Sequence, residues 1–552
     1  MILLAAPAAA QLRTGNIYFR AHDREERPLP GVYVYLRTPR DELLLRITDE
    51  RGEARFLDLL PDRGYTIRAQ GDDIRPIDYL AITVHAGRNT QVSMELLPGV
   101  VENLRIFSFA EPTLDRRDVA AGTTFFDERI EQRPGTFDLG ALAASTPEVL
   151  VDRTGAALFY EGIEIPAGAA VDLLSVAEVH VRTGGSHPVL ATAGATVDLI
   201  TKRGRNTWAG AVRYRDLDEV IDRGIEGGGA LKKDQLWIWG SYAKPVVRRH
   251  DLETTALALD GNLTFSDSFK AFIWNGDGTE AWKIEDTYTF VNGSYATGFY
   301  GRVEGQDQIR AEGATVFEAG TVQHDVRYGA AFRSGSRMDD RSLYAQDVLP
   351  FGPLTASVGL RWDRQDRAST VVPRLGLTWA LGQDDLTLLS AGYSVFAGRP
   401  GQARTREAIL GIQHQLEDPE HHPAVGLHLL SRQNRGLPEP EGDLLGARLS
   451  VDGPRASPWL VRGFFFLEER GRWAYGLDAS HPLASALDWG LYAAASLVGR
   501  EDDPEQPLLD LGLQARYLPL SAGANLGLEV LDALDRGAER RAYGFSVTLS
   551  YR

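Results

Sequence analysis

Apolar and polar side chains alternate along most of the chain after about residue 207. In Leu354–Asp363 every second residue from Leu354 is apolar, and the residues between them are polar or glycine. The same pattern recurs in Val371–Leu381, in Leu509–Tyr517 and in Tyr543–Arg552. Because successive side chains of a β-strand point to opposite faces, this alternation predicts strands with one apolar and one polar face.

Strands of this kind follow one another to the end of the chain with almost no helical interruption. We expect about 22 of them, each about ten residues long, which is the length of a tilted membrane crossing. Their predicted starts lie near Thr207, Ile225, Leu236, Thr254, Ser268, Ala281, Ser294, Gln308, Thr321, Arg341, Pro353, Val371, Asp385, Arg406, Pro423, Asp443, Trp459, Arg472, Ala486, Leu508, Ala522 and Arg541. A sheet in lipid cannot leave an edge unpaired, so an all-β, antiparallel transmembrane barrel is expected, of a size that needs a plug. A large soluble all-β repeat protein is the alternative.

The connections between these strands fall into two sets. One set is tight and rich in turn residues, and the other is longer and charged, which is typical of the two rims of an outer-membrane barrel. The tight set is Lys233–Gln235, Ser266-Asp267, Asn292-Gly293, Pro350–Gly352 and Gly382–Asp384, and the longer set includes Asp216–Gly224, Ser334–Asp340 and Ser431–Gly442. All ten Trp lie between Trp208 and Trp489, mostly near predicted strand ends, where they are expected to form interfacial girdles.

The alternation also assigns charged residues to one face or the other. The lumen is expected to hold Arg213, Arg215, Arg302, Glu304, Arg361 and Asp363, which would solvate the interior and form salt bridges with the plug. Asp286 falls on the lipid side of its strand, where a carboxylate is costly, and we interpret this as a register error or a bulge.

Two smaller regions precede the barrel. Residues 11–98 read as a compact β-sandwich with turn signals between short strands. Residues 99–206 have a different sequence pattern, which predicts short strands, two short helical stretches and Gly turns. They are predicted to form the plug inside a barrel of residues 207–552. Met1–Ala10 is similar to the end of a secretory signal peptide, with a disordered apolar tail as the alternative.

The composition excludes several kinds of chemistry and binding partner. The 552 residues include no Cys, which excludes disulfides and thiolate chemistry. The formal net charge of −17 disfavours nucleic acid as a partner. No run of about eighteen apolar residues is present, so no transmembrane helix is expected.

Residues 11–98 resemble the carboxypeptidase regulatory-like domain. The resemblance is carried by Pro28–Val32, Thr48–Gly52, Leu59–Pro61 and Gly64-Tyr65. It brings no catalytic group and implies a stable periplasmic spacer.

The whole chain resembles a TonB-dependent outer-membrane receptor of the Oar-like branch, which places such a domain before the plug and barrel. Barrel matches are Leu343–Asp347 with Leu354–Asp363, Val372–Leu377 and Ala391–Tyr393. The plug match rests on Glu178, Val179, Val181, Arg182, Gly184, Gly185, Leu199, Ile200, Thr201 and Lys202. The chain departs from the family at His187–Ala195, where a Tyr-Gly and a paired Gly are usual, at its last residue, Arg552, and in its short extracellular loops.

The resemblance implies a TonB box just before the plug. The candidate is the segment Val100, Val101, Glu102, Asn103, Leu104, Arg105 and Ile106, and a plain linker strand is the alternative. The implied partners are outer-membrane lipid, a TonB-type inner-membrane energising complex, an unidentified ligand and other envelope proteins. The implied location is the bacterial outer membrane, with the N-terminal domain in the periplasm.

No motif for catalysis or for a cofactor is found. The chain has no Walker loop, dinucleotide fingerprint, zinc-hydrolase helix or nucleophile elbow, so we expect neither an enzyme nor a cofactor. His421-His422 and Glu501–Asp503 lack the spacing of a metal site. Two functions remain: energised uptake of a ligand, and a structural or docking subunit of an envelope complex that keeps the fold without transport.

Overall fold

The fold is described from a computed structural model, in which most of the chain is β-strand. The described residues are 13–71, 74–96, 104–110, 114–132, 139, 142, 157–166, 168–185, 187–189, 191, 194–217, 220–247, 250–264, 266–290, 292–320, 322–334, 339–365, 368–382, 386–397, 404–416, 424–435, 444–452, 460–468, 473–486, 489–500, 508–517, 522–531 and 542–551. The proposed signal remnant therefore lies outside the described residues. Within them, no helix is both long and apolar enough to cross a membrane.

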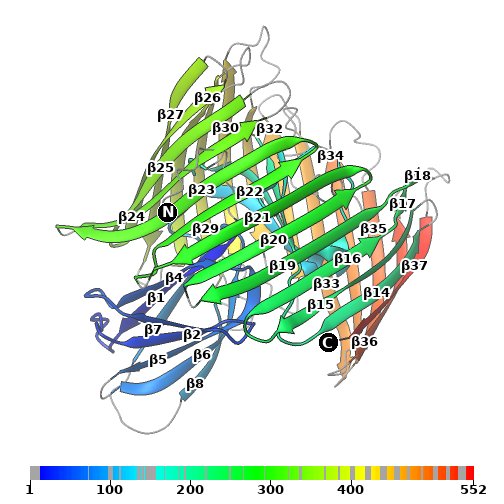
Figure 1. The fold of residues 1–552 in the computed structure, drawn as a ribbon, viewed down its shortest axis with the longest axis horizontal. Coiled ribbons are helices and arrows are strands. Elements are labelled where there is room, and N and C mark those ends of the chain that lie inside the picture. The colour runs from blue at the N-terminus through cyan, green and yellow to red at the C-terminus, as the bar shows by residue number, and fades with distance from the viewer. Residues whose placement is uncertain are drawn as a thin grey trace.

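The C-terminal two-thirds of the chain is a closed antiparallel barrel (Figure 1). Its first strand, β14, pairs with its last strand, β37, from Gly210↔Tyr551 to Leu217↔Gly544. The ring comprises 24 labelled strands, of which β17 (Val246–Val247) and β18 (His250–Asp251) form a small hairpin beyond β15 and β16, which leaves 22 in the wall. The prediction of a 22-stranded barrel is confirmed.

The strands of the wall are 8 to 14 residues long. They are β14 (Ala209–Leu217), β15 (Val220–Lys232), β16 (Leu236–Ala243), β19 (Thr254–Thr264), β20 (Asp267–Gly276), β21 (Thr279–Thr289), β22 (Tyr295–Val303), β23 (Gln306–Ala319), β24 (Val322–Ser334), β25 (Asp339–Phe351), β26 (Leu354–Gln365), β27 (Ala368–Leu381), β28 (Thr387–Phe396), β29 (Arg404–Gln415), β30 (Ala424–Arg435), β31 (Leu444–Asp452), β32 (Leu460–Glu468), β33 (Trp473–Ala486), β34 (Trp489–Arg500), β35 (Leu508–Tyr517), β36 (Ala522–Leu531) and β37 (Ala542–Tyr551). The predicted starts agree with these to within three residues, except that β15 begins at Val220 instead of Ile225.

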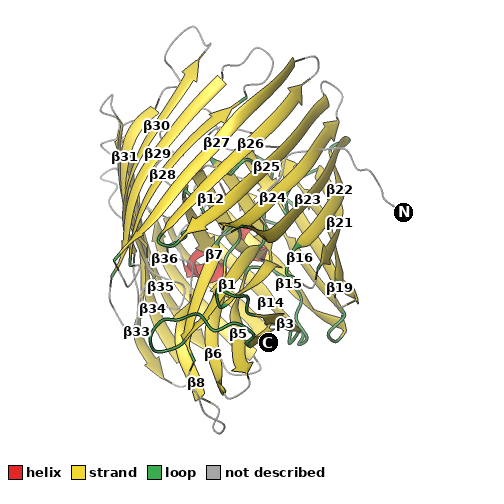
Figure 2. Ribbon diagram, turned by 90° about the vertical axis from the view of Figure 1, so that its left-hand side faces the viewer, coloured by secondary structure: helices red, strands yellow, loops and turns green. Residues whose placement is uncertain are grey.

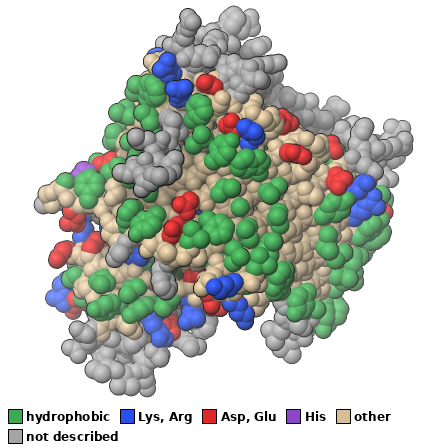
Figure 3. Space-filling model, in the orientation of Figure 1, with side chains coloured by type: hydrophobic (Ala, Val, Ile, Leu, Met, Phe, Trp, Pro, Cys, Tyr) green, Lys and Arg blue, Asp and Glu red, His purple; other side chains and the backbone are tan. Residues whose placement is uncertain are grey.

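The outer face of the wall is apolar and the inner face is polar. Leu360, Val371 and Leu528 are among the most exposed apolar side chains of the outer face, whereas Arg361 and Arg374 are buried on the inner face. Figure 3 shows apolar side chains spread across the front wall, with charged ones gathered toward its margins. This distribution suits a wall between lipid and a filled lumen.

The placement of Asp286 corrects an expectation. β21 pairs with both neighbours without a shift in register, and Asp286 stands opposite Phe269 and Gly298 with its side chain exposed. Asp286 is therefore on the outer face, and the proposed register error or bulge was wrong. It lies three residues before the end of β21, near the rim at the Ser266-Asp267 turn and not at mid-wall, so the cost of its charge is reduced.

The tight turns are not confined to one rim. Asp277-Gly278 joins β20 to β21 and Glu304-Gly305 joins β22 to β23, both on the rim opposite the predicted tight turns. All four residues have positive φ, as a two-residue type I′ hairpin requires. The wall between β20 and β23 therefore ends without a long loop on either rim.

Residues before the plug form a two-sheet sandwich. One sheet has the order β4-β1-β7 and the other β3-β2-β5-β6-β8. Ile17, Phe19, Val34, Phe56 and Ile67 belong to the apolar core between them. The strands are β1 (Gly15–His22), β2 (Tyr33–Arg37), β3 (Leu43–Ile47), β4 (Glu53–Leu59), β5 (Asp62–Gly71), β6 (Ile74–Val84), β7 (Asn89–Glu95) and β8 (Leu104–Ala110).

Strand β8 extends the sandwich beyond the residue at which we expected it to end. It pairs in parallel with β6, from Ile77↔Leu104 to Ile82↔Ala110, and forms an edge of the larger sheet. The expected boundary at residue 98 therefore falls inside the chain segment that completes this sheet.

The plug is a five-stranded sheet of order β11-β10-β13-β12-β9 inside the barrel. Its elements are β9 (Ala120–Phe126), α1 (Asp127–Gln132), β10 (Ala157–Tyr160), β11 (Ile163–Ile165), the 3-10 turn η1 (Leu173–Ser175), β12 (Val176–Gly185) and β13 (Thr196–Thr201). In Figure 2 the helix, in red, lies within the ring of strands.

The sandwich lies against one end of the barrel, where it contacts β19, β21 and β24 (Figure 1). Arg51 Nη1 of the sandwich donates a hydrogen bond of 3.3 Å to Gln323 of β24, next to the turn between β23 and β24. We call this end the sandwich-side rim and the other end the opposite rim.

Candidate functional site: the plug and its attachments

The predicted plug motif falls on two adjacent antiparallel strands. Glu178, Val179, Val181, Arg182, Gly184 and Gly185 lie on β12, Leu199, Ile200 and Thr201 lie on β13, and Lys202 follows β13. Glu178 stands opposite Ile200, and Val179 stands opposite Leu199. The structure therefore brings the two halves of the motif together as the central hairpin partners of the plug sheet.

One face of this sheet packs against aromatic residues of the wall. Val179, Val181 and Leu199 share a buried cluster with Trp239 and Phe272, which point into the lumen. The Tyr160 ring meets Phe272 edge-on, at 4.8 Å between centroids, and Trp274 at 5.7 Å. Aromatic pairs of this kind add to the stability gained from burial alone.

These contacts correct the interpretation of the tryptophans as girdles. Trp237, Trp239 and Trp274 are buried on the inner side of the wall. Trp208, Trp379 and Trp489 are exposed, as interfacial residues should be. Position along a strand predicted a rim location, but whether a residue faces outward or toward the plug depends on the register of its strand in the wall.

The far end of β12 is fixed to the wall by glycines. A Cβ on Gly184 would lie 2.5 Å from Ile409 Cδ1 and 2.9 Å from Glu407 Oε1. The amide of Gly185 donates to Glu407 Oε1 at 3.2 Å, and Ser394 Oγ donates to the Gly185 carbonyl at 2.9 Å. Glycine is therefore required here because the plug backbone approaches the wall too closely for a side chain.

Arginines of the wall bind carbonyl groups of the plug. Arg432 Nη2 donates to the Thr183 carbonyl at 2.9 Å and also contacts Glu407. Arg361 donates to the carbonyls of Pro188 and Val189, each at 3.1 Å, and is oriented by Asp363 at 2.8 Å. The segment that departs from the family pattern, which begins at His187, is thus held by the wall through its backbone.

The predicted lumenal residues divide into two groups. Arg213, Arg215, Arg361 and Asp363 are buried on the inner face, as expected. Arg302 was assigned wrongly, because the inward residues of β22 are the odd-numbered ones and Arg302 points outward, 2.7 Å from Asp307. Glu304 was also assigned wrongly, since it lies in the exposed turn after β22.

Glu178 ties the plug to the sandwich. Its carboxylate accepts a hydrogen bond from the Ala86 amide at 3.0 Å and lies 2.5 Å from His85 Nδ1. Both partners belong to the turn between β6 and β7. Arg182 donates to the Gly87 carbonyl in the same turn at 3.4 Å. Two of the predicted motif residues therefore hold the sandwich, a role that sequence alone did not indicate.

Lys202 ties the end of the plug to the first hairpin of the barrel. Its ammonium lies 3.0 Å from Glu226 of β15 and 3.4 Å from Glu131 of α1. Burial by itself lowers the pKa of Lys202, but the carboxylates of Glu226 and Glu131 outweigh it, so the pKa of Lys202 is raised and the side chain stays charged.

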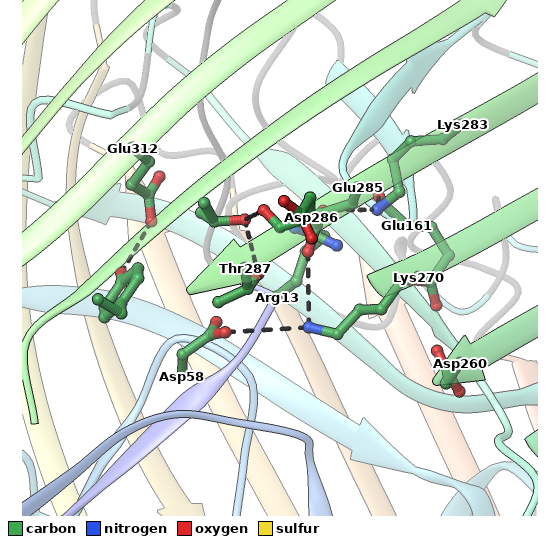
Figure 4. Close-up of polar contacts among 12 residues, drawn as sticks. Arg13, Asp58, Glu161, Asp260, Lys270, Lys283, Glu285, Asp286, Thr287 and Glu312 are labelled. Carbon is green, nitrogen blue, oxygen red and sulfur yellow. Dashed lines mark hydrogen bonds and ion pairs between the residues drawn. The ribbon is translucent and has the colours of Figure 1, made fainter. Parts of the chain in front are cut away.

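A buried ionic cluster joins the sandwich, the plug and the wall (Figure 4). Asp260 of β19 accepts hydrogen bonds of 2.8 Å from Arg40 of the sandwich and 2.8 Å from Arg203, which follows the plug. Arg203 also contacts Glu161 in the plug turn between β10 and β11. One carboxylate of the wall thus connects all three parts. We call the whole group the three-part ionic cluster; it contains Arg13, Arg40, Asp58, Glu161, Arg203, Asp260, Lys270, Lys283 and Glu285.

The second half of the cluster is centred on Glu285 of β21. It contacts Arg13 of the sandwich and lies 3.1 Å from Lys283 and 3.5 Å from Lys270. Lys283 Nζ donates to the Glu161 carbonyl at 2.7 Å. Removing one partner of such a buried set costs about 3–5 kcal/mol, because the others remain charged and buried.

Several sequence candidates lie outside this region. Of the TonB-box candidate, Val100–Asn103 lie outside the described residues, and Leu104, Arg105 and Ile106 begin β8 at the edge of the sandwich. His421-His422 and Glu501–Asp503 also lie outside the described residues. Within the described part of the chain, no group of three or more possible metal ligands is found.

Comparisons with known proteins support this arrangement. Residues 192–406 match the family model described as TonB dependent receptor-like, beta-barrel. The TonB-dependent transporter Oar of Myxococcus xanthus is 26% identical over 267 residues, which are 39% of this chain and 25% of that protein. The match thus spans a quarter of the length of that relative.

Solved structures share the fold at low sequence identity. The alcaligin outer membrane receptor FauA of Bordetella pertussis superimposes with a TM-score of 0.60, 15% identity and coverage of 79% of this chain and 96% of that chain. The open form of the ferric-catecholate import receptor Fiu of E. coli K12 superimposes with a TM-score of 0.64 and 12% identity. The superposition covers 79% of this chain and 97% of that chain. In its barrel sequence and its plug-and-barrel fold, the chain is similar to the TonB-dependent receptors of the outer membrane.

Proposed function

We propose that the protein is a gated transporter for the energised uptake of a ligand across the outer membrane. The observation that carries this proposal is the way the plug is held. The plug has its own sheet, and within the described residues it shares no ladder with the wall. Its polar attachments are hydrogen bonds and ion pairs, which can exchange with water when the plug moves, and the rest of its contact with the wall is side-chain packing.

The sandwich lies on the periplasmic side in this proposal. It lies at the same end of the barrel at which the plug joins β14, and its turn at Ala86 binds Glu178 of the plug. A force applied to the sandwich therefore reaches the plug through the chain and through this turn. The ligand would enter from the opposite rim.

The TonB-type partner would engage the chain near β8. Residues 100–103 precede β8 and residues 104–106 begin it, and β8 is an edge strand of the larger sandwich sheet. An edge strand offers unpaired backbone groups to an added strand. A pulling force on a strand paired there would act first on the sandwich and then on the plug, because the chain continues from β8 to β9, the first strand of the plug.

A pull-down with the periplasmic domain of TonB tests this function. Replacement of Val100–Asn103 by Gly-Ser residues leaves the described part of β8 unchanged and is expected to abolish retention of the partner. The matched control replaces the exposed turn residues Arg24 and Glu25 of the sandwich and should retain it. Equal retention by both variants would refute a TonB box at this position.

A structural or docking subunit is the second candidate. It is favoured by the two-residue turns Asp277-Gly278 and Glu304-Gly305, which leave part of the opposite rim without loops for a ligand. Failure of the unmodified protein to bind TonB, together with stable co-purification of other envelope proteins, would select this function over uptake.

A further inference from the structure

One edge of the sandwich is a strand that carries a row of exposed apolar side chains. β3 is the last strand of the larger sheet, and β2 is the described strand with which it pairs. Leu43, Leu45 and Ile47 of β3 are 57%, 43% and 55% exposed. They lie on the outer face of the sheet, where the exposed ring of Tyr33 on β2 stands opposite Ile47. Contiguous exposed apolar surface of this kind usually marks an interaction site.

This face points away from the barrel. The smaller sheet of the sandwich, β4-β1-β7, is the one that meets the wall. Tyr18 of β1 donates a hydrogen bond of 2.6 Å to Asp325 of β24, and Leu57 of β4 shares a buried cluster with Tyr295 of β22. The larger sheet lies behind the smaller one, across the apolar core. The outer face of β3 is therefore open to the compartment beyond the sandwich-side rim.

The backbone of β3 also has one free side. The Thr48 amide, just after β3, donates to the Val32 carbonyl, just before β2, so this pair is hydrogen-bonded. Bonded and non-bonded pairs alternate along an antiparallel ladder, so the backbone groups of the odd-numbered residues of β3 point away from β2. The Leu45 carbonyl accepts a hydrogen bond of 2.8 Å from the guanidinium of Arg46, which takes the place of a donor on a further strand. An open edge of this kind accepts an added strand.

Arg46 is a cation without a carboxylate partner. Its side chain lies on the core side of β3, with its Cζ 5.6 Å from the centroid of the Phe56 ring. Its Nε is buried and has no hydrogen-bond acceptor in the described part of the chain. Burial lowers the pKa of Arg46 below its usual value, and no carboxylate offsets this.

Three acidic residues that flank β3 are engaged elsewhere. Glu42 accepts a hydrogen bond from Asn262 of β19. Asp49 and Glu53 both accept hydrogen bonds from Arg55, at 3.2 Å and 2.6 Å. The described chain thus offers the guanidinium at the edge of β3 no carboxylate, whereas an added strand could carry one.

We propose that β3 is a docking edge for an extended segment of another protein, which adds to the larger sheet and sets a carboxylate opposite Arg46. Apolar side chains on either side of that carboxylate would pack on the row formed by Leu43, Leu45 and Ile47. The charge of Arg46 selects this occupant over a second copy of the chain. Self-pairing of β3 about Leu45 would set Leu44 opposite Arg46 and leave the guanidinium unpaired. Given the orientation under Proposed function, the docking protein is periplasmic.

Two peptides and the full-length protein in nanodiscs test the proposal. Each labelled peptide has valine at every second position, and the residue that would face Arg46 is glutamate in one peptide and glutamine in the other. Fluorescence anisotropy measures both affinities. The glutamate peptide is expected to bind about tenfold more tightly, which corresponds to one hydrogen bond between charged groups.

Three variants separate the charge from the apolar row. Arg46→Gln should weaken the glutamate peptide about tenfold and leave the glutamine peptide unchanged. Leu43→Thr with Ile47→Thr keeps side chains that suit a strand but removes apolar surface, so it should weaken both peptides. The matched control is Arg68→Gln on β5 of the same sheet, where Arg68 is paired with Asp78, and it should change neither.

The proposal is overturned if Arg46→Gln weakens both peptides equally or neither, or if Arg68→Gln has the same effect. Dimers of the protein that exclude the peptides would overturn it in favour of a second copy. Peptide binding that is present in detergent but absent in nanodiscs would overturn it in favour of lipid on this face. The TonB pull-down depends on the other edge of the sheet, at β8, and should be unchanged by Arg46→Gln, so failure of this site and failure of the uptake function are distinguishable.

Discussion

Arg40 of the sandwich donates a hydrogen bond of 2.8 Å to Asp260 of the barrel wall, and both side chains are buried. The other carboxylate oxygen of Asp260 accepts from Arg203, at the end of the plug. A single acidic residue of the wall therefore holds both the sandwich and the end of the plug.

Substitution Asp260→Asn is expected to release the sandwich from the rim. It leaves Arg40 and Arg203 charged and buried without their shared partner, at a cost of about 3–5 kcal/mol. Hydrogen exchange of the Ala86 amide, which is bonded to Glu178 when the sandwich is docked, measures the release. Arg68→Gln, which breaks the partly exposed Arg68–Asp78 pair within the sandwich, is the control and should leave that exchange unchanged.

An engineered disulfide should lock the plug to the wall. A Cβ on Gly392 of β28 would lie 3.6 Å from Cβ of Val119, just before β9, which is within disulfide range. The chain has no Cys, so Val119→Cys with Gly392→Cys creates a single possible pair. We expect any TonB-dependent loss of plug protection from proteolysis to disappear in the oxidised protein and to return on reduction.

The control for this lock is a disulfide within the wall. A Cβ on Gly527 would lie 3.5 Å from Cβ of Ser546, its direct partner on β37. Gly527→Cys with Ser546→Cys joins two neighbouring strands and leaves the plug free. If both disulfides block plug movement equally, the plug does not move relative to β28.

Substitution Gly184→Ala should loosen the end of β12. The added Cβ would lie 2.5 Å from Ile409 Cδ1, and overpacking of this kind costs about 1–3 kcal/mol. Faster hydrogen exchange of the Gly185 amide, which is bonded to Glu407, is the expected readout. Gly240→Ala is the matched control, because its Cβ would meet Leu257 Cδ1 at an ordinary 3.5 Å. An unchanged exchange rate of the Gly185 amide would show that β29 can shift to accommodate the added methyl group.

The stability of the plug should fall as the pH rises through neutrality. Burial raises the pKa of Asp198 to about 7 despite the nearby guanidiniums of Arg182, Arg310 and Arg13. His180, opposite Asp198 on β12, stays neutral because burial holds its pKa well below 6.5. A carboxyl whose pKa is higher in the folded plug than its ordinary 3.8 stabilises the fold fully below pH 3.8, and the contribution is lost as the pH rises through about 7.

We therefore expect the plug to be less stable at pH 8 than at pH 5, by about 2–3 kcal/mol, and expect Asp198→Asn to remove the difference. Denaturant titrations followed by fluorescence of Trp239 and Trp274, which pack against the plug, measure this. Asp23→Asn, in an exposed turn of the sandwich, should leave the difference unchanged. A pH difference that persists in Asp198→Asn would assign it to another group.

The sequence by itself determined the barrel. Alternation in segments such as Leu354–Asp363 predicts that the segment is a strand, how long it is and which residues share a face, because every second side chain of a strand lies on the same side of the sheet. It also determined that the residues of the plug motif form two strands. It placed Asp286 on the outer face correctly and was wrong only in treating that position as a register error. It failed at Arg302, because a shift of one residue in register exchanges the two faces and the turn residues alone do not fix that register.

The tertiary structure decided what the plug and sandwich contact. Arg40 and Asp260 are 220 residues apart, and no pattern along the chain pairs them. Nor does the sequence distinguish Trp274, which packs on the plug, from Trp379, which faces outward. Local alternation records only which side of a strand a residue occupies, whereas buried ion pairs and close Gly contacts depend on where the chain returns after hundreds of residues.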